Sequence, residues 1–267
     1  MLALAPAVAL LGVLFAGSLL GAAKVSVVPL CGGLGDASLD QWQALFDDPA
    51  FIDSLLFTLR VAVLSTALAA AAGVALALVL RRAGGAVSRT LAALPLPLPH
   101  LLVAVVAVVW LAPGGLAERL LGGLPFDFVR DRQGLGVIAV YAYKEAPFIA
   151  LLVLAAMGRS LAQREEAAAV LGAGALQRAR WVLWPTIRGP LVIGCVIVSA
   201  FAVGGLEVPL AIGPNYPPAL AEFAYQSTQG DVISGEAQAA AALLVAGAMA
   251  IALATIAVRF ARNLDDE

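Results

Sequence analysis

The sequence predicts an all-α integral membrane protein with six transmembrane helices, and three observations lead to this prediction. Hydrophobic residues make up 62% of the 267 residues and charged residues only 13%, whereas soluble domains are roughly half apolar and a quarter charged. The mean hydropathy is correspondingly high, at +0.96. The apolar residues form long blocks separated by short polar stretches, with no period of two or 3.6 residues. Most of this chain is therefore built for lipid as its solvent.

Six of these blocks are long enough for a helix to cross the hydrocarbon core, which takes about 20 apolar residues. Blocks such as 61–80 are apolar on all sides, which favours helices, because the strands of a barrel are shorter and alternate. The first block resembles a signal peptide, but no Lys or Arg precedes it and its apolar run is long, so we expect a retained helix. The predicted spans are residues 2–23, 54–80, 90–112, 135–157, 188–212 and 238–258.

The basic residues between these spans predict the orientation, because cytoplasmic loops carry an excess of Lys and Arg. With the N-terminus inside the cell, ten bases fall on the cytoplasmic side and four on the outside. The inner ten are Arg81, Arg82, Arg89, Arg159, Arg164, Arg178, Arg180, Arg188, Arg259 and Arg262, and the outer four are Lys24, Arg119, Arg130 and Arg132. We therefore expect both termini in the cytoplasm.

The rest of the composition excludes several other classes of function. A net charge of −2 gives no argument for a nucleic-acid partner, so membrane lipid is the expected surrounding. The two cysteines, Cys31 and Cys195, are not expected to pair, because one lies in a loop and the other in an apolar block. The sequence shows no metal-ligand cluster and no phosphate-binding G-x-x-x-x-G-K-[ST] loop. We expect no cofactor in this chain.

The longest cytoplasmic segment, residues 159–185, lies between the fourth and fifth spans and predicts a helix–turn–helix outside the bilayer. Ser160 and Gln163 have the spacing of a capping box at the start of a helix rich in Ala and Glu. Gly172 stands where a left-handed residue can end that helix, and a second short helix follows towards Pro185. From composition alone, the segment could equally be a solvated connector or an interfacial helix whose arginines meet anionic lipid.

The spacing of residues in this segment resembles the EAA loop of the permease subunits of type I ATP-binding-cassette (ABC) importers, whose pattern is E-A-A-x3-G-x9-I-x-L-P. The matching residues are Glu166, Ala167, Ala168, Gly172 and Pro185, while Val182 replaces the Ile and Trp184 the Leu. The resemblance extends over about residues 50–260. It implies one transmembrane domain over residues 1–267, with a first span and outer loop in 1–50, a core permease in 51–262 and a cytoplasmic coupling loop in 159–185.

The resemblance also implies the partners and the place of this chain. In such importers the loop forms coupling helices that dock on a cytoplasmic dimer of ATPases, which bind ATP and Mg²⁺, so the permease itself is not an enzyme. A second permease copy or homologue, an extracytoplasmic solute-binding protein and the bacterial plasma (inner) membrane are implied as well. Leu171, Gly172 and Ala173 look most like the branch for polyamines, thiamine, ferric iron or oxyanions. The alternative is a secondary transporter or channel subunit, which needs no EAA loop.

Ionisable residues within membrane spans are costly and therefore candidates for function. They could line the solute pathway, with Glu207 the best candidate because it lies near the outer mouth, or they could form structural ion pairs. Adjacent Lys144 and Glu145 do not share a helix face, so each is expected to need its own partner. The candidates are Arg60, Lys144, Glu145 and Glu207.

Two spans are expected to contain broken helices. Pro95, Pro97 and Pro99 interrupt the start of the third span, and Gly204, Gly205 and Pro209 surround Glu207 in the fifth. Irregular backbone at membrane depth usually lines a cavity, although a proline kink satisfied by neighbouring helices would give the same pattern. His100 is expected to be a packed or hydrogen-bonded residue rather than a ligand.

Overall fold

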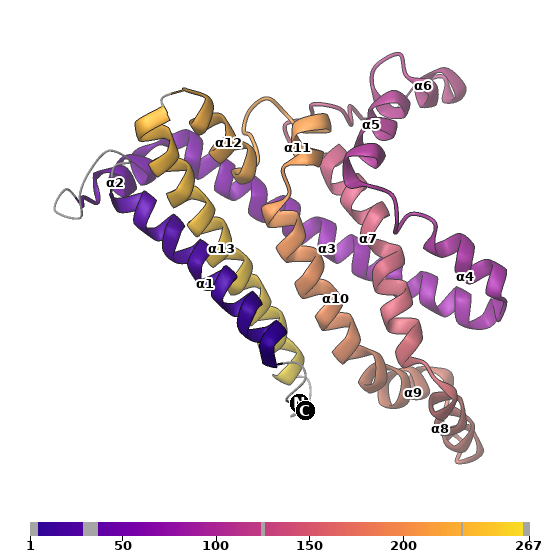
Figure 1. Ribbon diagram of the computed structural model, residues 1–267. Coiled ribbons are helices and arrows are strands. Elements are labelled where there is room, and N and C mark those ends of the chain that lie inside the picture. The colour runs from indigo at the N-terminus through magenta and orange to yellow at the C-terminus, as the bar shows by residue number, and fades with distance from the viewer. Residues whose placement is uncertain (1–4, 29–36, 124–125, 231, 264–267) are drawn as a thin grey trace.

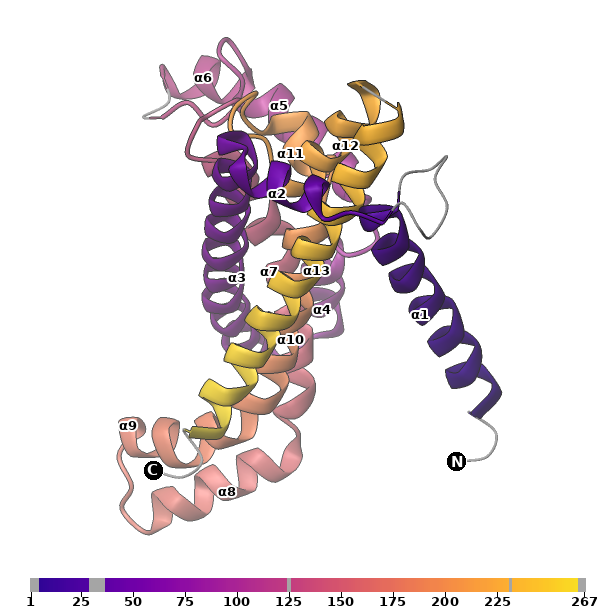
Figure 2. The ribbon, with the colours of Figure 1, turned by 90° about the vertical axis from the view of Figure 1, so that its left-hand side faces the viewer.

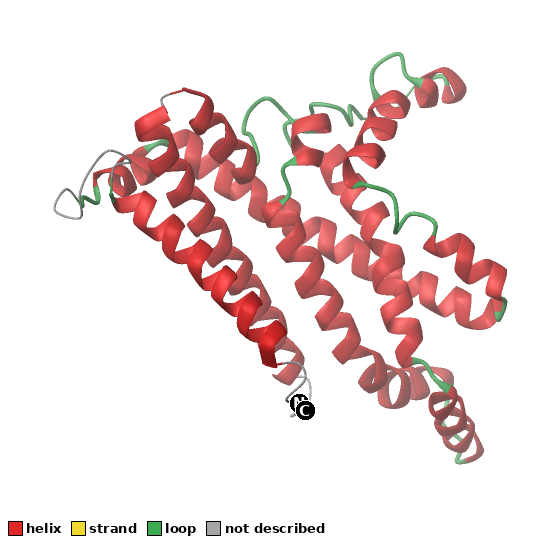
Figure 3. Ribbon diagram, viewed as in Figure 1, coloured by secondary structure: helices red, strands yellow, loops and turns green. Residues whose placement is uncertain are grey.

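The structure is a computed structural model that describes residues 5–28, 37–123, 126–230 and 232–263. Within these ranges all regular secondary structure is helical (Figure 3). Six helical segments are long and apolar enough to cross a membrane. They are Pro6–Val27, Pro49–Ala83, His100–Leu121, Leu135–Ala156, Ala175–Gly204 and Gly235–Arg262. The predicted fold class is confirmed.

Five long helices make up about half of the described residues (Figure 1). Their bounds are α1 Ala5–Val27, α3 Pro49–Ala83, α7 Leu135–Ala156, α10 Trp184–Gly204 and α13 Val232–Asn263. The shorter elements are α2 Asp40–Asp47, α4 Ala86–Ala93, α5 His100–Leu111, α6 Leu116–Leu121, α8 Arg159–Val170, α9 Ala175–Arg178, the π-helical turn Ala179–Leu183, α11 Glu207–Ile212 and α12 Leu220–Gly230.

The short helices gather at the two ends of the long ones. Figures 1 and 2 show α2, α6, α11 and α12 at one end and α8 and α9 at the other, which also holds the start of α1 and the end of α13. Figure 2 shows α1 splaying away from the main bundle. Most of its side chains are exposed, among them Phe15 at 68% and Leu20 at 71%. A membrane-spanning helix with such an apolar surface faces lipid.

The predicted third and fifth spans are both interrupted in the structure. The range 90–112 includes the end of α4, the proline segment before His100, and α5. Each Pro lacks a backbone N–H and disfavours α-helical backbone in the residue before it, so the helix stops and restarts. The range 188–212 likewise divides into α10 and α11, with Gly205 extended at φ −73° and ψ 124°. The expected breaks are therefore confirmed.

Helix α3 has strong stop and start signals at both ends. The Asp48 carboxylate accepts a hydrogen bond from the Ala50 N–H at 2.8 Å, and Pro49 occupies the first turn, where its missing N–H has no cost. At the far end, Arg81 and Arg82 lie in the last turn and Gly84 is left-handed at φ +65°. These signals define a 35-residue helix about 52 Å long, longer than the hydrocarbon core.

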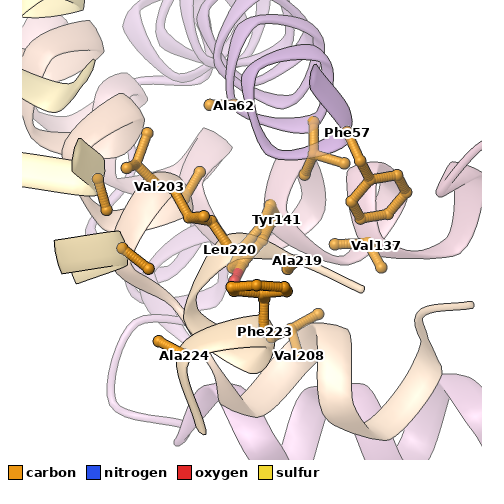
Figure 4. Close-up of a cluster of buried hydrophobic side chains, with 14 of the residues drawn as sticks. Phe57, Ala62, Val137, Tyr141, Val203, Val208, Ala219, Leu220, Phe223 and Ala224 are labelled. Atoms are coloured by element: carbon orange, nitrogen blue, oxygen red, sulfur yellow. The ribbon is translucent and has the colours of Figure 1, made fainter. Parts of the chain in front are cut away.

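Two clusters of buried apolar side chains hold the helices together. The first lies towards the α12 end, where Phe57 of α3, Val137 of α7, Val203 of α10 and Phe223 of α12 meet (Figure 4). The second, called the inner cluster below, lies towards the α8 end and includes Ile149, Val153, Leu161 and Ile187. Helices α3, α7 and α10 contribute to both clusters, so they form the core of the fold.

Close approach of these three helices depends on two glycines that face Ile149 of α7. A Cβ on Gly73 of α3 would lie 2.8 Å from the Ile149 Cβ and 2.9 Å from the Ala146 carbonyl oxygen. A Cβ on Gly194 of α10 would lie 3.2 Å from Ile149 Cγ1. Small residues of this kind let membrane helices pack backbone against side chain.

We predict that Gly73→Ala destabilises the protein by about 1–3 kcal/mol, because α3 and α7 must move apart to admit one methyl group. The control is Gly247→Ala in α13, where nothing lies within 4 Å of the added carbon. Melting temperatures of both purified variants measure the difference. Equal melting temperatures would show that this contact does not set the helix spacing.

Candidate functional site

The segment between α7 and α10 forms two short helices joined by a tight turn. Gly172 takes the left-handed conformation expected of it, with φ +88°. The Gly172 N–H donates to the Ala169 carbonyl and the Ala173 N–H to the Ala168 carbonyl, both at 2.9 Å, which closes the end of α8. Helix α9 then begins after Gly174, whose N–H donates to Gln177 Oε1 at 2.8 Å.

The capping box predicted at Ser160 is wrong. Helix α8 begins one residue earlier, at Arg159, and its N-cap is Gly158 with extended backbone and no side-chain cap. Met157 is the C-cap of α7 and is buried in the inner cluster. Gly158 follows it and lets the chain turn directly into α8. Ser160 is consequently the second residue of the helix and does not occupy the N-cap position.

Two contacts attach α8 to the membrane helices. Arg81, in the last turn of α3, forms a two-pronged ion pair with Glu165, with Nη1 to Oε1 at 3.1 Å and Nη2 to Oε2 at 2.5 Å. Leu161 is fully buried in the inner cluster. Bidentate Arg–carboxylate pairs fix orientation as well as distance. Helix α8 is thus anchored on one side by an ion pair and an apolar side chain.

The other side of this segment is open. Glu166 is exposed, although its neighbour Glu165 is paired, because successive helix residues point about 100° apart. Large apolar side chains are exposed beside it, with Val170 and Leu171 at 87% and Leu176 at 83%. Such side chains clustered at the end of a membrane bundle mark a contact surface. Of the predicted site residues, Ala167 and Pro185 are also exposed and Ala168 partly so.

At the opposite half of the molecule, the break between α10 and α11 opens a cavity of about 450 Å³. Its lining includes His100 at the start of α5, Tyr141 of α7, Phe201 of α10 and Glu207 of α11. Because Gly204 and Gly205 carry no side chains, the backbone itself forms part of the wall. Both broken helices therefore border one space, as irregular backbone in a membrane is expected to do.

The four intramembrane charges do not pair with one another among the described residues. The Lys144 ammonium donates to the Leu96 carbonyl at 3.0 Å, and Glu145 bonds His100 Nε2 at 2.7 Å. The expectation of separate partners for these neighbours is confirmed. The Arg60 guanidinium donates to the Arg132 carbonyl at 3.1 Å and lies 5.7 Å from the centre of the Phe57 ring.

Glu207 is the fourth of these charges, and the structure places it at the cavity. It is exposed, and it forms no ion pair or side-chain hydrogen bond with the residues described. His100 is packed, as expected: its ring stacks on Phe201 with ring centres 4.3 Å apart and an angle of 23°.

Three functional residues were not found by sequence reasoning. Arg81 and Glu165 pair across 84 positions of sequence, which no local pattern shows. Tyr141 is buried to 1% exposure with a hydroxyl that has no hydrogen-bond partner in the described chain. A tyrosine in an apolar span could have been noted, since buried Tyr hydroxyls usually find partners.

Comparison with known proteins tests the resemblance. Residues 67–267 match the family described as the binding-protein-dependent transport system inner membrane component. The chain belongs to this family. Among curated proteins it resembles the inner membrane ABC transporter permease protein YnjC of Escherichia coli strain K12, with 33% identity over 216 residues. The match covers 78% of this chain but 41% of YnjC, so the chain spans about two fifths of that relative.

Two solved structures share the fold of this transport-system component. One is a bacterial alginate ABC transporter in complex with an alginate pentasaccharide-bound periplasmic protein, with a TM-score of 0.77 and 20% identity over 98% of this chain and 93% of that one. The other is a bacterial ABC transporter involved in the import of the acidic polysaccharide alginate, with a TM-score of 0.72 and 20% identity over 97% and 93% of the two chains.

Family membership confirms the permease resemblance and makes this chain a multi-pass inner membrane component. The finer assignment to the polyamine, thiamine, ferric iron or oxyanion branch stays a prediction.

We predict that the adjacent glutamates of α8 behave differently when neutralised. Glu165→Gln should raise amide hydrogen exchange in residues 159–172 by up to about fivefold, equivalent to about 1 kcal/mol for a partly exposed pair. Glu166→Gln is the matched control and should leave exchange unchanged, because that side chain is exposed. Exchange measured by mass spectrometry on the purified protein gives both values. Equal exchange in the two variants would contradict the anchoring role of Arg81.

Proposed function

We propose that this chain is one permease subunit of an ABC importer and that its α8–α9 segment couples the membrane helices to a cytoplasmic ATPase dimer. The observation that carries the proposal is the two-sided construction of this segment. Arg81 and Leu161 fix one side to the bundle, while Glu166, Leu171 and Leu176 stand exposed on the other. A force applied to the exposed side therefore reaches α3 and the inner cluster through contacts already formed.

ATP hydrolysis belongs to the partner in this proposal, because this sequence contains no phosphate-binding loop. ATP and Mg²⁺ would bind in the ATPase subunits. The residues proposed to meet that partner are Glu166, Ala167, Ala168 and the turn at Gly172, with Pro185 at the base of α10. Ala side chains permit close docking, and the Glu166 carboxylate can accept a charge-assisted hydrogen bond.

The end that holds α8 and α9 is cytoplasmic in this proposal, together with both chain termini. The excess of basic residues at this end supports the orientation. The opposite end would receive solute from an extracytoplasmic binding protein. A second permease, identical or homologous, would complete the pathway, and exposed apolar residues along α10, such as Ile193 and Ile197, offer a surface for it.

Of the intramembrane charges, Glu207 is the residue we assign to the solute pathway, since it borders the cavity without a partner among the described residues. Arg60, Lys144 and Glu145 bind carbonyls or His100 and are assigned structural roles. A secondary transporter or channel would have no use for the α8–α9 segment. Co-purification with an ATPase distinguishes these possibilities.

We predict that Gly172→Val abolishes co-purification with the partner ATPase, while membrane insertion persists. A left-handed backbone costs a non-glycine residue about 1–2 kcal/mol, and a β-branched residue fits it poorly. Gly174→Val is the matched control, because Gly174 is extended at φ −67° and ψ 169°, a conformation that Val adopts without strain.

The measurement is the ATPase recovered per permease after affinity purification from membranes. Normal recovery with Gly172→Val would contradict the role of the turn. Absence of any ATPase with the wild-type chain would favour the secondary transporter or channel.

A further inference from the structure

The cavity between α10 and α11 has the size and setting of a site for a small molecule. Its volume of about 450 Å³ lies within the roughly 300–1,000 Å³ typical of ligand pockets. It lies beside the two places where membrane-spanning helices are interrupted, at Pro99 and at Gly205. The chemistry of its wall indicates what class of molecule it would accept.

The charge at the wall is negative. Glu207 lines the cavity, whereas none of the lining residues is Lys or Arg. His100, which also lines the cavity, is hydrogen-bonded to Glu145, with Nε2 and Oε1 2.7 Å apart.

Tyr141 brings an unused polar group to this wall. The residue is 1% exposed, and its hydroxyl oxygen has no hydrogen-bond partner in the described chain. A buried polar group without a partner costs about 1–3 kcal/mol, so a ligand that bonds this hydroxyl recovers that energy. The hydroxyl lies beside Gly205, another residue of the wall, in the space that the Cβ of any other residue would occupy.

Aromatic faces complete the site. Phe201 is 44% exposed on α10, lines the cavity and stacks on His100. Aromatic faces beside a carboxylate suit an organic ammonium ion, which they bind through cation–π attraction. A hard metal ion suits the site poorly, since Mg²⁺ and Ca²⁺ need six or more oxygen ligands. The described residues hold no group of three His, Cys, Asp or Glu side chains that could bind a metal.

We propose that this cavity is a transit site selective for small organic cations, with Glu207 pairing the ammonium group, Phe201 contacting it face-on and the Tyr141 hydroxyl bonding a polar group of the solute. The proposal rests on the permease function and names the substrate class for it. The Glu207 carboxylate repels an anionic solute, so this cavity does not suit an acidic polysaccharide. Gly205 acts as a positioning residue, because it leaves room for the Tyr141 hydroxyl.

The test uses three probes of different charge on the full chain in lipid nanodiscs, with binding measured by saturation-transfer NMR. Choline carries the cation and a hydroxyl, 3,3-dimethylbutan-1-ol is its uncharged carbon analogue, and glucuronate is an anion. We expect binding of choline but not of the other two. Glu207→Gln should raise the Kd of choline at least about tenfold, equivalent to about 1.4 kcal/mol.

Two further variants sharpen the result. Gly205→Ala should weaken choline binding by displacing the Tyr141 hydroxyl, and Tyr141→Phe, which keeps the ring, should weaken it to a similar degree. Asp127→Asn removes an exposed charge at the same end of the protein but away from the cavity, so it should leave the Kd unchanged. Equal binding of the uncharged analogue, preference for glucuronate, or an unchanged Kd in Glu207→Gln would overturn the proposal.

Failure of this proposal is distinguishable from failure of the proposed function. ATPase co-purification depends on the α8–α9 segment at the opposite end of the molecule and should be normal in Glu207→Gln. Loss of choline selectivity with normal ATPase recovery would therefore overturn the cation site alone. Lack of ATPase recovery in the wild type would overturn the importer assignment.

Discussion

In a hydrocarbon medium no water is present to satisfy backbone N–H and C=O groups, so each must find a partner within the protein. This constraint accounts for the all-helical architecture and makes each interruption of a helix informative. The two interruptions at membrane depth, before His100 and after Gly204, lie on different helices yet border the same cavity. The stack of His100 on Phe201 joins the helices at that point.

Helix α3 contacts other elements at both of its ends and so connects the two ends of the fold. Near its N-terminal end, Asp53 accepts a hydrogen bond from the Tyr216 hydroxyl at 2.5 Å, and Thr58 Oγ1 accepts one from the Leu220 N–H at 2.8 Å. At its other end, Arg81 holds α8. This 35-residue helix, with buried side chains in both apolar clusters, therefore links the α8–α9 segment to the segment that precedes α12. The cavity lies against α7 and α10, and α7 packs on both α3 and α10 through Ile149.

Sequence reasoning predicted what depends on local chemistry. Long apolar blocks predicted the spans, Gly172 predicted the left-handed turn, and the proline and glycine clusters predicted the broken helices. It did not predict contacts between residues far apart in sequence. Arg81 was assigned to a basic loop and Glu165 was passed over, because only the crossing of α3 and α8 brings them together. Tyr141 has no local signal for an unpartnered hydroxyl, since the space that the hydroxyl occupies depends on the absence of a side chain at Gly205.

Glu222 of α12 is a second kind of residue whose surroundings the sequence alone did not predict. From the sequence it counts as one of several acids in an outer loop, but α12 folds back on the bundle and leaves it 7% exposed, with Oε1 accepting from Gln226 Nε2 at 3.2 Å. Burial raises the pKa of this carboxyl group, against the smaller opposing effects of the Ala219 backbone and Arg130. Net charge and loop counts predict the side of the membrane, while the packing of each helix decides which of its charges meet water.

The central claim is that the exposed side of the α8–α9 segment touches an ATPase, and photocrosslinking tests it most directly. p-Benzoylphenylalanine would be placed at Leu171, which is 87% exposed on this segment, and separately at Leu120, which is 70% exposed at the opposite end. Irradiation of cells that express the assembled transporter should yield a crosslink to the ATPase subunit from Leu171 and none from Leu120. Crosslinks from Leu120 alone, or from neither position in cells where the ATPase is present, would contradict the proposed coupling surface.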